Sequence, residues 1–318
     1  MVTTPTLLVH GRAVDLSRPL LMGIVNATPD SFSDAGLYPT TASRVTLADE
    51  LVASGADVID VGGQSGITGV PEVDAAEEVD RVVPVIEGIR AHHPDVLISV
   101  DTYKPPVAAA AIAAGASIIN DVSGLLYPDV ADICASTGAA LVIMHNRSKP
   151  KVRLTDPLLY DDVTADVCGF LTEKLAVALE RGMQPEAVLF DPGVDFAKTP
   201  FQTITLLSEI DRVEALGRPL LFALSRKDFI GALTHRAPRE RLAGTLAAMA
   251  HLGSRPGHLY RMHDIADAVD YLTVQAALEG RVPVTPDLEL PVALRRQPSE
   301  ASGGRSTTRA AASSNPPA

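Results

Sequence analysis

Apolar runs of strand length recur along the chain, and each run ends in a polar side chain. Helix-like segments separate the runs. In chain order the polar residues at the ends of the runs are Asn26, Asp60, Asp101, Asn120, Asp121, His145, Asp191, Ser225 and Arg261. If the strands are parallel neighbours, their carboxyl ends lie at one edge of the sheet, and these side chains converge there.

The spacing of the runs predicts eight strand-helix units. The strands are expected at 20–26, 57–61, 97–101, 117–121, 140–145, 187–191, 219–225 and 258–262. Alternating strands and helices over this length are typical of a parallel sheet. Eight units favour closure into an α/β fold of the TIM (β/α)₈ barrel type, and an open doubly wound sheet is the competing arrangement.

The remaining segments divide the chain further. Residues 1–19 are expected to form an N-terminal segment with a short β-hairpin that turns at His10 and Gly11 and plugs the bottom of the barrel. The barrel itself is expected over 20–285. The polar, low-complexity stretch 296–318 cannot bury enough apolar surface to offset the entropy of ordering, so it is predicted to be a disordered tail.

Composition narrows the class of protein. Hydrophobic residues make up 46% of the 318 residues and Trp is absent, which suits an aliphatic core of strands buried on both faces. The net charge of -12 argues against nucleic-acid binding, which needs clustered cations. The two cysteines form no disulfide framework and favour a reducing, cytoplasmic compartment. No signal peptide or apolar stretch of membrane-spanning length is present, so no membrane partner is expected.

Carboxylate and amide side chains end three different predicted strands. Asp101, Asn120 and Asp191 are hydrogen-bond acceptors suited to a planar heterocycle with N–H edges, and charge assistance roughly doubles the strength of such bonds. Each residue taken alone is equally well explained as a turn or cap residue. Three of them at the mouth of one barrel favour a binding site.

Cationic side chains follow the last two predicted strands. Arg226 and Lys227 come after the seventh strand, and Arg261 and His263 belong to the eighth. Loops after strands 7 and 8 of such barrels often bind phosphate, so we expect an anion site there. A solvated basic edge is the alternative, and it is disfavoured because the chain is acidic overall.

The loop after the first strand, NATPDSFSD, is rich in oxygen donors. Its oxygen-bearing side chains, Asn26, Asp30, Ser31, Ser33 and Asp34, could hold Mg²⁺, which takes a few protein oxygens and completes its shell with substrate phosphates. Phe32 gives the loop an apolar anchor, as expected of a lid.

A set of segments in a fixed order resembles one enzyme family. The segments are MGIVNATPDSFSDAG, VIDVGGQS, ISVDTYKP, IINDVSG, VIMH, LFDPGVDFAK, LSRKDFIG, ERLAGTLA and RMHD, and they run from residue 22 to residue 264. Together they resemble the dihydropteroate synthases of the pterin-binding family. The resemblance implies a (β/α)₈ barrel, usually homodimeric, and a transferase of folate biosynthesis.

The reaction implied by the resemblance joins 6-hydroxymethyl-7,8-dihydropterin pyrophosphate to p-aminobenzoate and releases pyrophosphate and 7,8-dihydropteroate. By motif, Asp101, Asn120, Met144, Asp191, Lys227 and Arg261 would hold the pterin, with Lys227, Asp101 and Arg261 as the catalytic residues. Asn26, Arg261 and His263 would bind the pyrophosphate; Phe32, Phe196 and Ser225 would contact p-aminobenzoate; Asn26 and Asp34 would hold Mg²⁺.

Two segments depart from the family pattern. The second loop is close to GGESTRPG in the family, whereas this chain has Gly66, Ile67 and Thr68 in place of its Thr, Arg and Pro. Loss of the Arg removes a charge-assisted phosphate contact, about 1.5–3 kcal/mol if nothing compensates. Asp195 stands where the family usually has Gly, beside Phe196. It would repel the carboxylate of p-aminobenzoate unless it points away and pairs with Lys198 or Lys149.

Three hypotheses follow from these departures. The first is an active dihydropteroate synthase with a compensated second loop. The second is a pterin-binding paralogue with lost or altered aryl-amine activity. The third, a corrinoid-linked methyltransferase domain on the same barrel, is disfavoured by the SRK motif at 225–227 and by the first loop.

Overall fold

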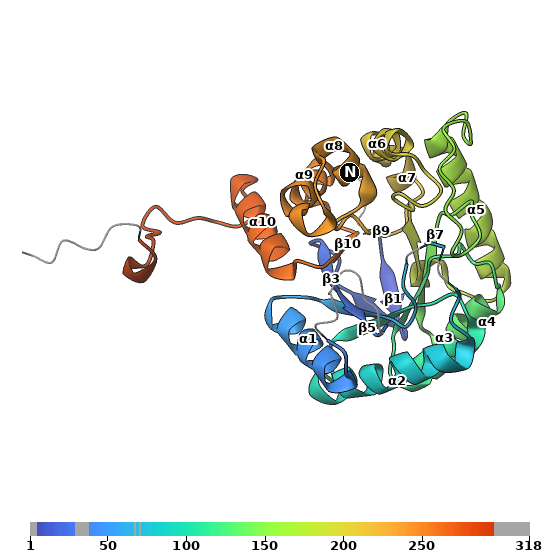
Figure 1. The fold of residues 1–318 in the computed structure, drawn as a ribbon. Helices are drawn as coiled ribbons and strands as arrows, with labels where there is room; N and C mark the ends of the chain where they lie inside the picture. The colour runs from blue at the N-terminus through green and yellow to red at the C-terminus, as the bar shows by residue number, and fades with distance from the viewer. Residues whose placement is uncertain (1–4, 29–37, 67, 70, 296–318) are drawn as a thin grey trace, which may run out of the picture. The chain divides into compact units, whose positions relative to one another are not determined.

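The computed structural model describes residues 5–28, 38–66, 68–69 and 71–295. Within these residues, eight parallel strands close into a barrel, and helices surround it (Figure 1). The strands are β3 (Leu20–Asn26), β4 (Val58–Gly62), β5 (Leu97–Asp101), β6 (Ile118–Asp121), β7 (Ala140–Met144), β8 (Val188–Asp191), β9 (Leu220–Phe222) and β10 (His258–Met262). The predicted TIM barrel is therefore confirmed, and the open sheet is wrong.

Helices connect successive strands and pack on the outside of the barrel (Figure 1). They are α1 (Thr41–Ala53), α2 (Ala75–His92), α3 (Pro105–Ala113), α4 (Asp129–Thr137), α5 (Val163–Glu180), α6 (Pro200–Ser208), α7 (Ile210–Glu214), α8 (Asp228–Thr234), α9 (Leu242–Leu252) and α10 (Ile265–Leu278), with 3₁₀ turns at Pro185–Ala187, Pro238–Glu240 and Val292–Leu294. Side-chain caps fix several starts: Thr40, Asp74, Asp162 and Thr199 each accept a hydrogen bond from a backbone N–H of the first turn.

Two details differ from the sequence-based expectation. The segment between β8 and β9, for which the strand-helix pattern predicts one helix around 201–216, is broken at Glu209, where the backbone leaves helical geometry, so that α6 and α7 are separate. Arg212, in α7, then reaches Asp162, the N-cap of α5, with Nη2 2.9 Å from Oδ2. The short helix α8, directly after Lys227, was not anticipated.

The strands alternate inward- and outward-facing residues, and this alternation divides the apolar core in two. Outward residues such as Ile59, Val100 and Phe190 pack against the helices. Inward residues of the first half of each strand, such as Met22, Val142 and Leu259, form a second cluster inside the barrel. The inner cluster closes the lower half of the barrel, as expected of a packed core rather than a pore.

The N-terminal hairpin completes the inner cluster from below. Strands β1 (Leu7–Val9) and β2 (Arg12–Val14) pair antiparallel around a turn at His10 and Gly11, both with positive φ. Leu7 and Val9 are buried in the inner cluster, and the N–H of His10 donates to the carbonyl of Gly138 at 2.6 Å. The hairpin therefore plugs the barrel, as its sequence indicates.

The chain divides into two compact units, Met1–Ala276 and Ala277–Ala318. The first unit holds all of the barrel strands, and the described part of the second holds the 3₁₀ turn Val292–Leu294. No helix in the described ranges is long and apolar enough to cross a membrane. The predicted tail at 296–318 lies outside the described residues, and the predicted boundary of the barrel at 285 stays a prediction.

Replacing Leu7 by Ala tests the plug. Leu7 is fully buried, and removal of its isobutyl group leaves a cavity in the inner cluster. We expect a loss of about 2–5 kcal/mol in the free energy of unfolding, measured by urea denaturation. Arg12→Ala, on the exposed face of the same hairpin, should change it by less than about 0.5 kcal/mol. Equal losses of unfolding free energy in the two variants would contradict the role of the hairpin as a plug of the barrel.

Candidate active site

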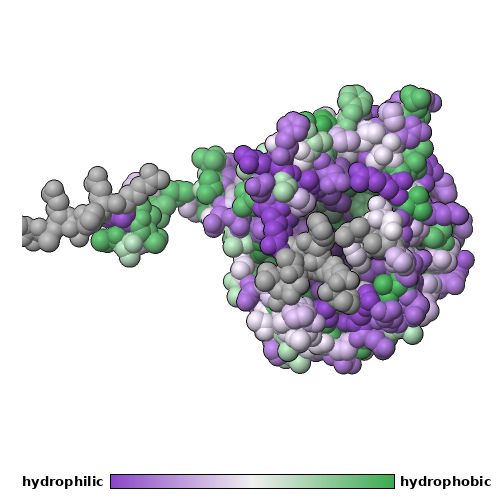
Figure 2. Space-filling view, viewed as in Figure 1, coloured by the Kyte–Doolittle hydropathy of each residue, from purple (hydrophilic) through white to green (hydrophobic). Residues whose placement is uncertain are grey.

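Above the apolar plug, the inward positions of the strands become polar. Strand pairing sets Asp60 beside Ser99 and Asp101 beside Asn120, and it sets Met144 beside Asp191 on the other side of the barrel. Asp101, Asn120, Met144 and Asp191 lie at or next to the carboxyl ends of their strands, and Asp60 and Ser99 lie one inward position deeper, so together they form a polar layer below the barrel mouth. Figure 2 shows hydrophilic side chains gathered around a hollow on this face of the barrel unit.

Arg261 of β10 ties this layer together. Its Nε lies 2.6 Å from Oδ2 of Asp60, and its Nη2 lies 3.2 Å from Oδ2 of Asp101. Asn120 donates to the same oxygen of Asp60 at 3.4 Å. The guanidinium therefore joins β4, β5 and β10 across the barrel, with its charge held between two carboxylates.

Asp60 is a member of the site to which the sequence gave no role. Its side chain is fully buried, and it lies one inward position deeper than the end of β4. Asp60 interrupts an apolar run, with Val58 and Ile59 before it and Val61 after it. A carboxylate in the middle of a predicted buried strand is the sequence signal that could have identified it as a site residue. A buried carboxylate inside a barrel requires a cation, and Arg261 supplies it.

Several buried polar atoms of this layer lack a protein partner. Among the described side chains they include Asp60 Oδ1, Asn120 Oδ1 and Ser99 Oγ. An unpartnered buried acceptor carries a desolvation cost of about 1–3 kcal/mol, so it indicates a ligand or water at that place. Acceptors of this kind suit a ligand that presents N–H groups.

Two carboxylates of the layer, Asp101 and Asp191, have raised pKa values. Burial raises the pKa of Asp101 to about 7, although the charge of Arg261 opposes the shift. Burial also raises the pKa of Asp191, and the N–H of Gly193, 2.7 Å from its Oδ1, opposes it. Gly193 has a positive φ, and a Cβ there would lie 2.0 Å from the carbonyl oxygen of His145, so only glycine permits this turn.

Lys227 and Phe196 lie on the other side of the mouth. The Nζ of Lys227 sits 4.4 Å from the centre of the Phe196 ring, a cation–π contact. Burial lowers the pKa of Lys227, while Asp195 and Asp191 raise it. Arg241 donates to the backbone carbonyls of Arg226 at 2.8 Å and Lys227 at 3.1 Å, which fixes the SRK segment.

Asp195 does not form the ion pairs suggested as its alternative role. Its Oδ2 accepts the N–H of Phe229 in the first turn of α8 at 3.2 Å, and its Oδ1 accepts from the hydroxyl of Thr203 at 3.2 Å. Its φ is +65°, which explains why glycine suits this position and why Asp tolerates it. The carboxylate is therefore engaged by α6 and α8.

Ser225 and His263 are joined by hydrogen bonds. Ser225 Oγ accepts the backbone N–H of His263 at 3.2 Å and lies 2.8 Å from its Nδ1. Burial and the nearby charges of Arg226 and Arg261 lower the pKa of His263 to about 3. The imidazole is therefore neutral at pH 7. Arg226 is bound to Asp264, with Nη2 2.7 Å from Oδ1, so its charge is already paired.

Some of the polar residues that follow the apolar runs lie outside the site. Asp121 accepts from the backbone N–H and the hydroxyl of Ser123, so it stabilises the turn after β6. His145 points out of the barrel wall, where its Nε2 lies 2.9 Å from Asp166 and its Nδ1 lies 2.8 Å from Nζ of Lys198. Burial lowers the pKa of His145 to about 4.

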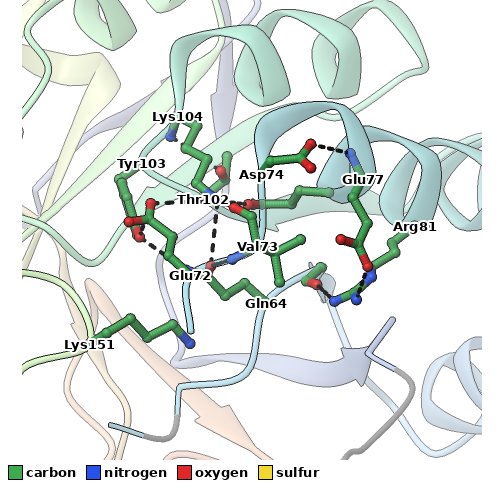
Figure 3. A network of polar contacts seen from close by, with 12 residues as sticks. Gln64, Glu72, Val73, Asp74, Glu77, Arg81, Thr102, Tyr103, Lys104 and Lys151 are labelled. Atoms are coloured by element: carbon green, nitrogen blue, oxygen red, sulfur yellow. Dashed lines mark hydrogen bonds and ion pairs between the residues drawn. The ribbon is translucent and has the colours of Figure 1, made fainter. Parts of the chain in front are cut away.

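The second loop is held by a polar network on the rim (Figure 3). Gln64 donates to the hydroxyl of Tyr103 at 3.0 Å and accepts the N–H of Val73 at 2.8 Å. Tyr103 donates to Glu72 at 2.7 Å, and Lys104 pairs with buried Glu78 at 2.7 Å. This network anchors both ends of the loop and leaves its tip at the mouth.

Of the predicted site residues, the structure brings Asp101, Asn120, Asp191, Lys227 and Arg261 to one mouth. Asn26, Met144, Phe196, Ser225 and His263 also lie at the carboxyl ends of their strands or in the loops that follow. Phe32, Asp34 and Ile67 lie outside the described residues. A cleft lined by Gly66, Thr68, Asp101 and Phe196 adjoins one lined by Phe196, Arg226 and Lys227.

Metal-binding side chains are sparse in the described ranges. No group of three or more His, Cys, Asp or Glu residues there is arranged to hold an ion. The amide of Asn26 at the end of β3 is a suitable oxygen donor close to Gly62. This donor set does not fit an all-protein cage. It fits an ion that takes most of its ligands from phosphate and water, as Mg²⁺ commonly does.

Comparison with known proteins agrees with this barrel and its polar mouth. A profile of the pterin binding enzymes matches residues 22–263. The dihydropteroate synthase of Escherichia coli K12 is 39% identical over 276 residues, covering 86% of this chain and 97% of that protein. A Xanthomonas albilineans dihydropteroate synthase structure with 4-aminobenzoic acid superposes with a TM-score of 0.80 at 42% identity, covering 88% and 100% of the two chains.

A second structure of the Xanthomonas albilineans enzyme, in complex with 7,8-dihydropteroate, gives a TM-score of 0.77 at 41% identity, covering 88% of this chain and all of that one. The fold and the polar mouth thus define a barrel enzyme of the pterin-binding class. The chain belongs to the pterin-binding enzyme family, and the relatives described here are dihydropteroate synthases.

The raised pKa of Asp101 predicts a pH-dependent contribution to stability. Its pKa is about 7 in the folded chain and 3.8 without the shift. Between these values the folded state keeps a proton that the unfolded state has lost. The stability from this group is therefore present below about pH 4 and declines as pH rises through 7.

Asp101→Asn removes this ionisation and should flatten that part of the profile. Urea unfolding of both proteins between pH 4 and 8 should show the variant gaining stability relative to the native protein as pH rises. If the unfolding free energies of the two proteins changed with pH in parallel, the raised pKa of Asp101 would be contradicted.

Proposed function

We propose that this chain condenses 6-hydroxymethyl-7,8-dihydropterin pyrophosphate with p-aminobenzoate, giving 7,8-dihydropteroate and pyrophosphate in folate biosynthesis. The observation that carries the proposal is the polar layer around Arg261, in which carboxylate and amide acceptors share one mouth with cations. The relatives that match nearly the whole barrel are transferases of this kind.

The polar layer suits the pterin. A dihydropterin ring presents an amino group and ring N–H groups, and these would donate to Asp101, Asn120 and Asp191. The unpartnered oxygens of Asp60 and Asn120 lie at the depth where such a ring would enter. Met144, buried beside Asp191 in the register, would line the apolar face, and Arg261 would stack on the ring.

The cations suit the diphosphate arm. Arg261 and Lys227 provide positive charge at the mouth, and Asn26 provides an amide. Because His263 is neutral, it would act as a hydrogen-bond donor and not as a cation. If Nδ1 accepts from the hydroxyl of Ser225, Nε2 carries the proton and faces the anion.

The chemistry needs charge stabilisation and positioning. The bond between the pterin methylene carbon and the bridging oxygen of the diphosphate breaks, and the electron pair leaves with pyrophosphate. Arg261 and Lys227 would stabilise the developing negative charge in a site that largely excludes water. The amine of p-aminobenzoate forms the new C–N bond and loses a proton, and it needs mainly to be held in line.

The second substrate would lie in the cleft that Phe196 shares with Lys227. Phe196, Ser225 and Lys227 would contact its ring and carboxylate, with Phe32 as a proposed cover. Asp195 is compatible with this arrangement because its carboxylate oxygens accept from Thr203 and Phe229. It also raises the pKa of Lys227 and so favours the charged ammonium.

Magnesium is proposed as the cofactor, held by Asn26 and Asp34 together with the substrate's phosphate oxygens. When bound, the ion would neutralise part of the diphosphate charge. We also propose a homodimeric assembly in the cytoplasm, as the family resemblance implies.

A second candidate function is supported by the second loop. A pterin-binding paralogue without aryl-amine turnover would keep the polar layer and lack the Arg that this loop carries in the family pattern. A coupled assay for pyrophosphate release distinguishes the two functions. The proposed enzyme releases pyrophosphate only when p-aminobenzoate is present, whereas binding of the dihydropterin pyrophosphate without amine-dependent release would support the paralogue.

Asp191→Asn tests the pterin site. Loss of a charge-assisted acceptor should weaken binding of the dihydropterin pyrophosphate by about 1.5–3 kcal/mol, roughly 10- to 150-fold, in a calorimetric titration. Asp132→Asn, an exposed carboxylate on α4 paired with Arg181, is the matched control and should bind like the native chain. Unchanged affinity of the Asp191 variant would contradict the assignment.

Removal of Mg²⁺ tests the cofactor. With EDTA present, we expect binding of the dihydropterin pyrophosphate to weaken at least about tenfold, because the ion neutralises diphosphate charge. Binding of the dihydropterin without its diphosphate should not change. Equal loss for both ligands would instead indicate a structural effect of the chelator.

A further inference from the structure

The second loop lacks a cation of its own. Residues 62–70 contain neither Lys nor Arg, although the loop forms part of the rim of the cleft. The net charge of the chain is -12, so an anionic ligand at this rim needs a local positive group. The question is which other element provides it.

The loop after β7 is the basic element facing this rim. It carries Arg147, Lys149, Lys151 and Arg153 between residues 146 and 160. Arg147 forms a bidentate ion pair with Asp166, with both N–O distances 2.8 Å, so Asp166 neutralises its charge. Arg153 is exposed and lies 3.8 Å from Asp228. Lys149 and Lys151 both line the cleft, and Lys151 differs from Lys149 because it is half-buried whereas Lys149 is exposed.

Lys151 forms two hydrogen bonds with the second loop. Its Nζ donates to the carbonyl of Ser65, and its own carbonyl accepts the N–H of Gly69 at 3.0 Å. Its backbone has a positive φ of +66°, a conformation that a non-glycine residue adopts at some cost. Figure 3 shows Lys151 reaching toward the segment that carries Gln64. These two contacts hold Lys151 against the second loop at the edge of the cleft.

Burial lowers the pKa of Lys151, and nearby carboxylates oppose this shift. The charge of Lys151 opposes the upward shift in the pKa of Asp101, and Asp101 in turn favours the charged form of Lys151. Glu72 and Glu78 favour it as well, while Lys104 and burial oppose it. An ammonium has three N–H donors, and the carbonyl of Ser65 accepts from one of them.

We propose that Lys151 supplies the cation that the second loop lacks and binds an oxyanion of a substrate above Asp101. The oxyanion is either the diphosphate of the pterin substrate or the carboxylate of the aryl amine. The proposal rests on the proposed function and adds to it a specificity-determining residue from a different loop. It also accounts for how the chain tolerates Gly66, Ile67 and Thr68.

Four variants test the proposal on the full chain. Lys151→Met removes the charge and Lys151→Arg keeps it. Lys149→Met, on an exposed residue two positions earlier in the same loop, is the matched control. The double variant Ile67→Arg with Lys151→Met returns a cation to the position that carries it in the family pattern. Thermal unfolding of each variant checks that it folds.

Two readouts separate the sources of the oxyanion. Calorimetry with inorganic pyrophosphate and Mg²⁺ reports the diphosphate arm, and KM for p-aminobenzoate in the pyrophosphate-release assay reports the carboxylate. Lys151→Met should either weaken pyrophosphate binding or raise the KM for p-aminobenzoate, in each case about 10- to 100-fold. The Lys151→Arg and Lys149→Met variants should stay within about threefold of the native chain. The double variant should recover at least part of the loss.

The proposal is overturned if Lys151→Met changes neither readout, or if Lys149→Met changes the same readout equally. A weakening that the double variant does not reduce would also overturn it, because the effect would then not be one of missing charge. A native chain without amine-dependent turnover would contradict the proposed function. The pyrophosphate titration needs no turnover, so it would still test whether Lys151 binds the diphosphate.

Discussion

The barrel mouth depends on one largely buried guanidinium. Arg261 crosses from β10 to β4 and β5, and its two contacts at 2.6 and 3.2 Å hold the carboxylates of Asp60 and Asp101 inside the barrel. Without that charge, two buried acidic groups would face each other in a poorly solvated interior. Breaking a buried pair of this kind is strongly destabilising, so the residue that organises the proposed pterin site also stabilises the upper half of the barrel.

The period-two alternation of the strands explains why site and core coexist on the same eight strands. Outward positions supply the contacts to the helices, lower inward positions supply the plug with the hairpin, and upper inward positions supply the polar layer. A shift of one residue would exchange inward and outward faces. The same rule separates Met144 at the mouth from His145, which lies behind the wall with Asp166 and Lys198.

The sequence predicted much of this arrangement because parallel strands put their ends together. The strands 20–26, 97–101 and 258–262 have the predicted bounds, and the motif residues of the polar layer converge as expected. The sequence did not predict that Asp60 pairs with Arg261, because partners 201 residues apart are known only once the barrel closes. Nor did it predict the neutral His263 or the hydrogen bonds of Asp195 to α6 and α8, both of which depend on neighbours from other elements.

The most direct measurement is a crystal structure of this chain with dihydropterin pyrophosphate and Mg²⁺. The account predicts the bicyclic ring in the polar layer, with N–H groups within hydrogen-bond distance of Asp101, Asn120 and Asp191, and the diphosphate between Arg261 and His263. A ring bound elsewhere, with the bonds among Asp60, Asp101 and Arg261 unchanged and no ligand atom in the polar layer, would contradict it.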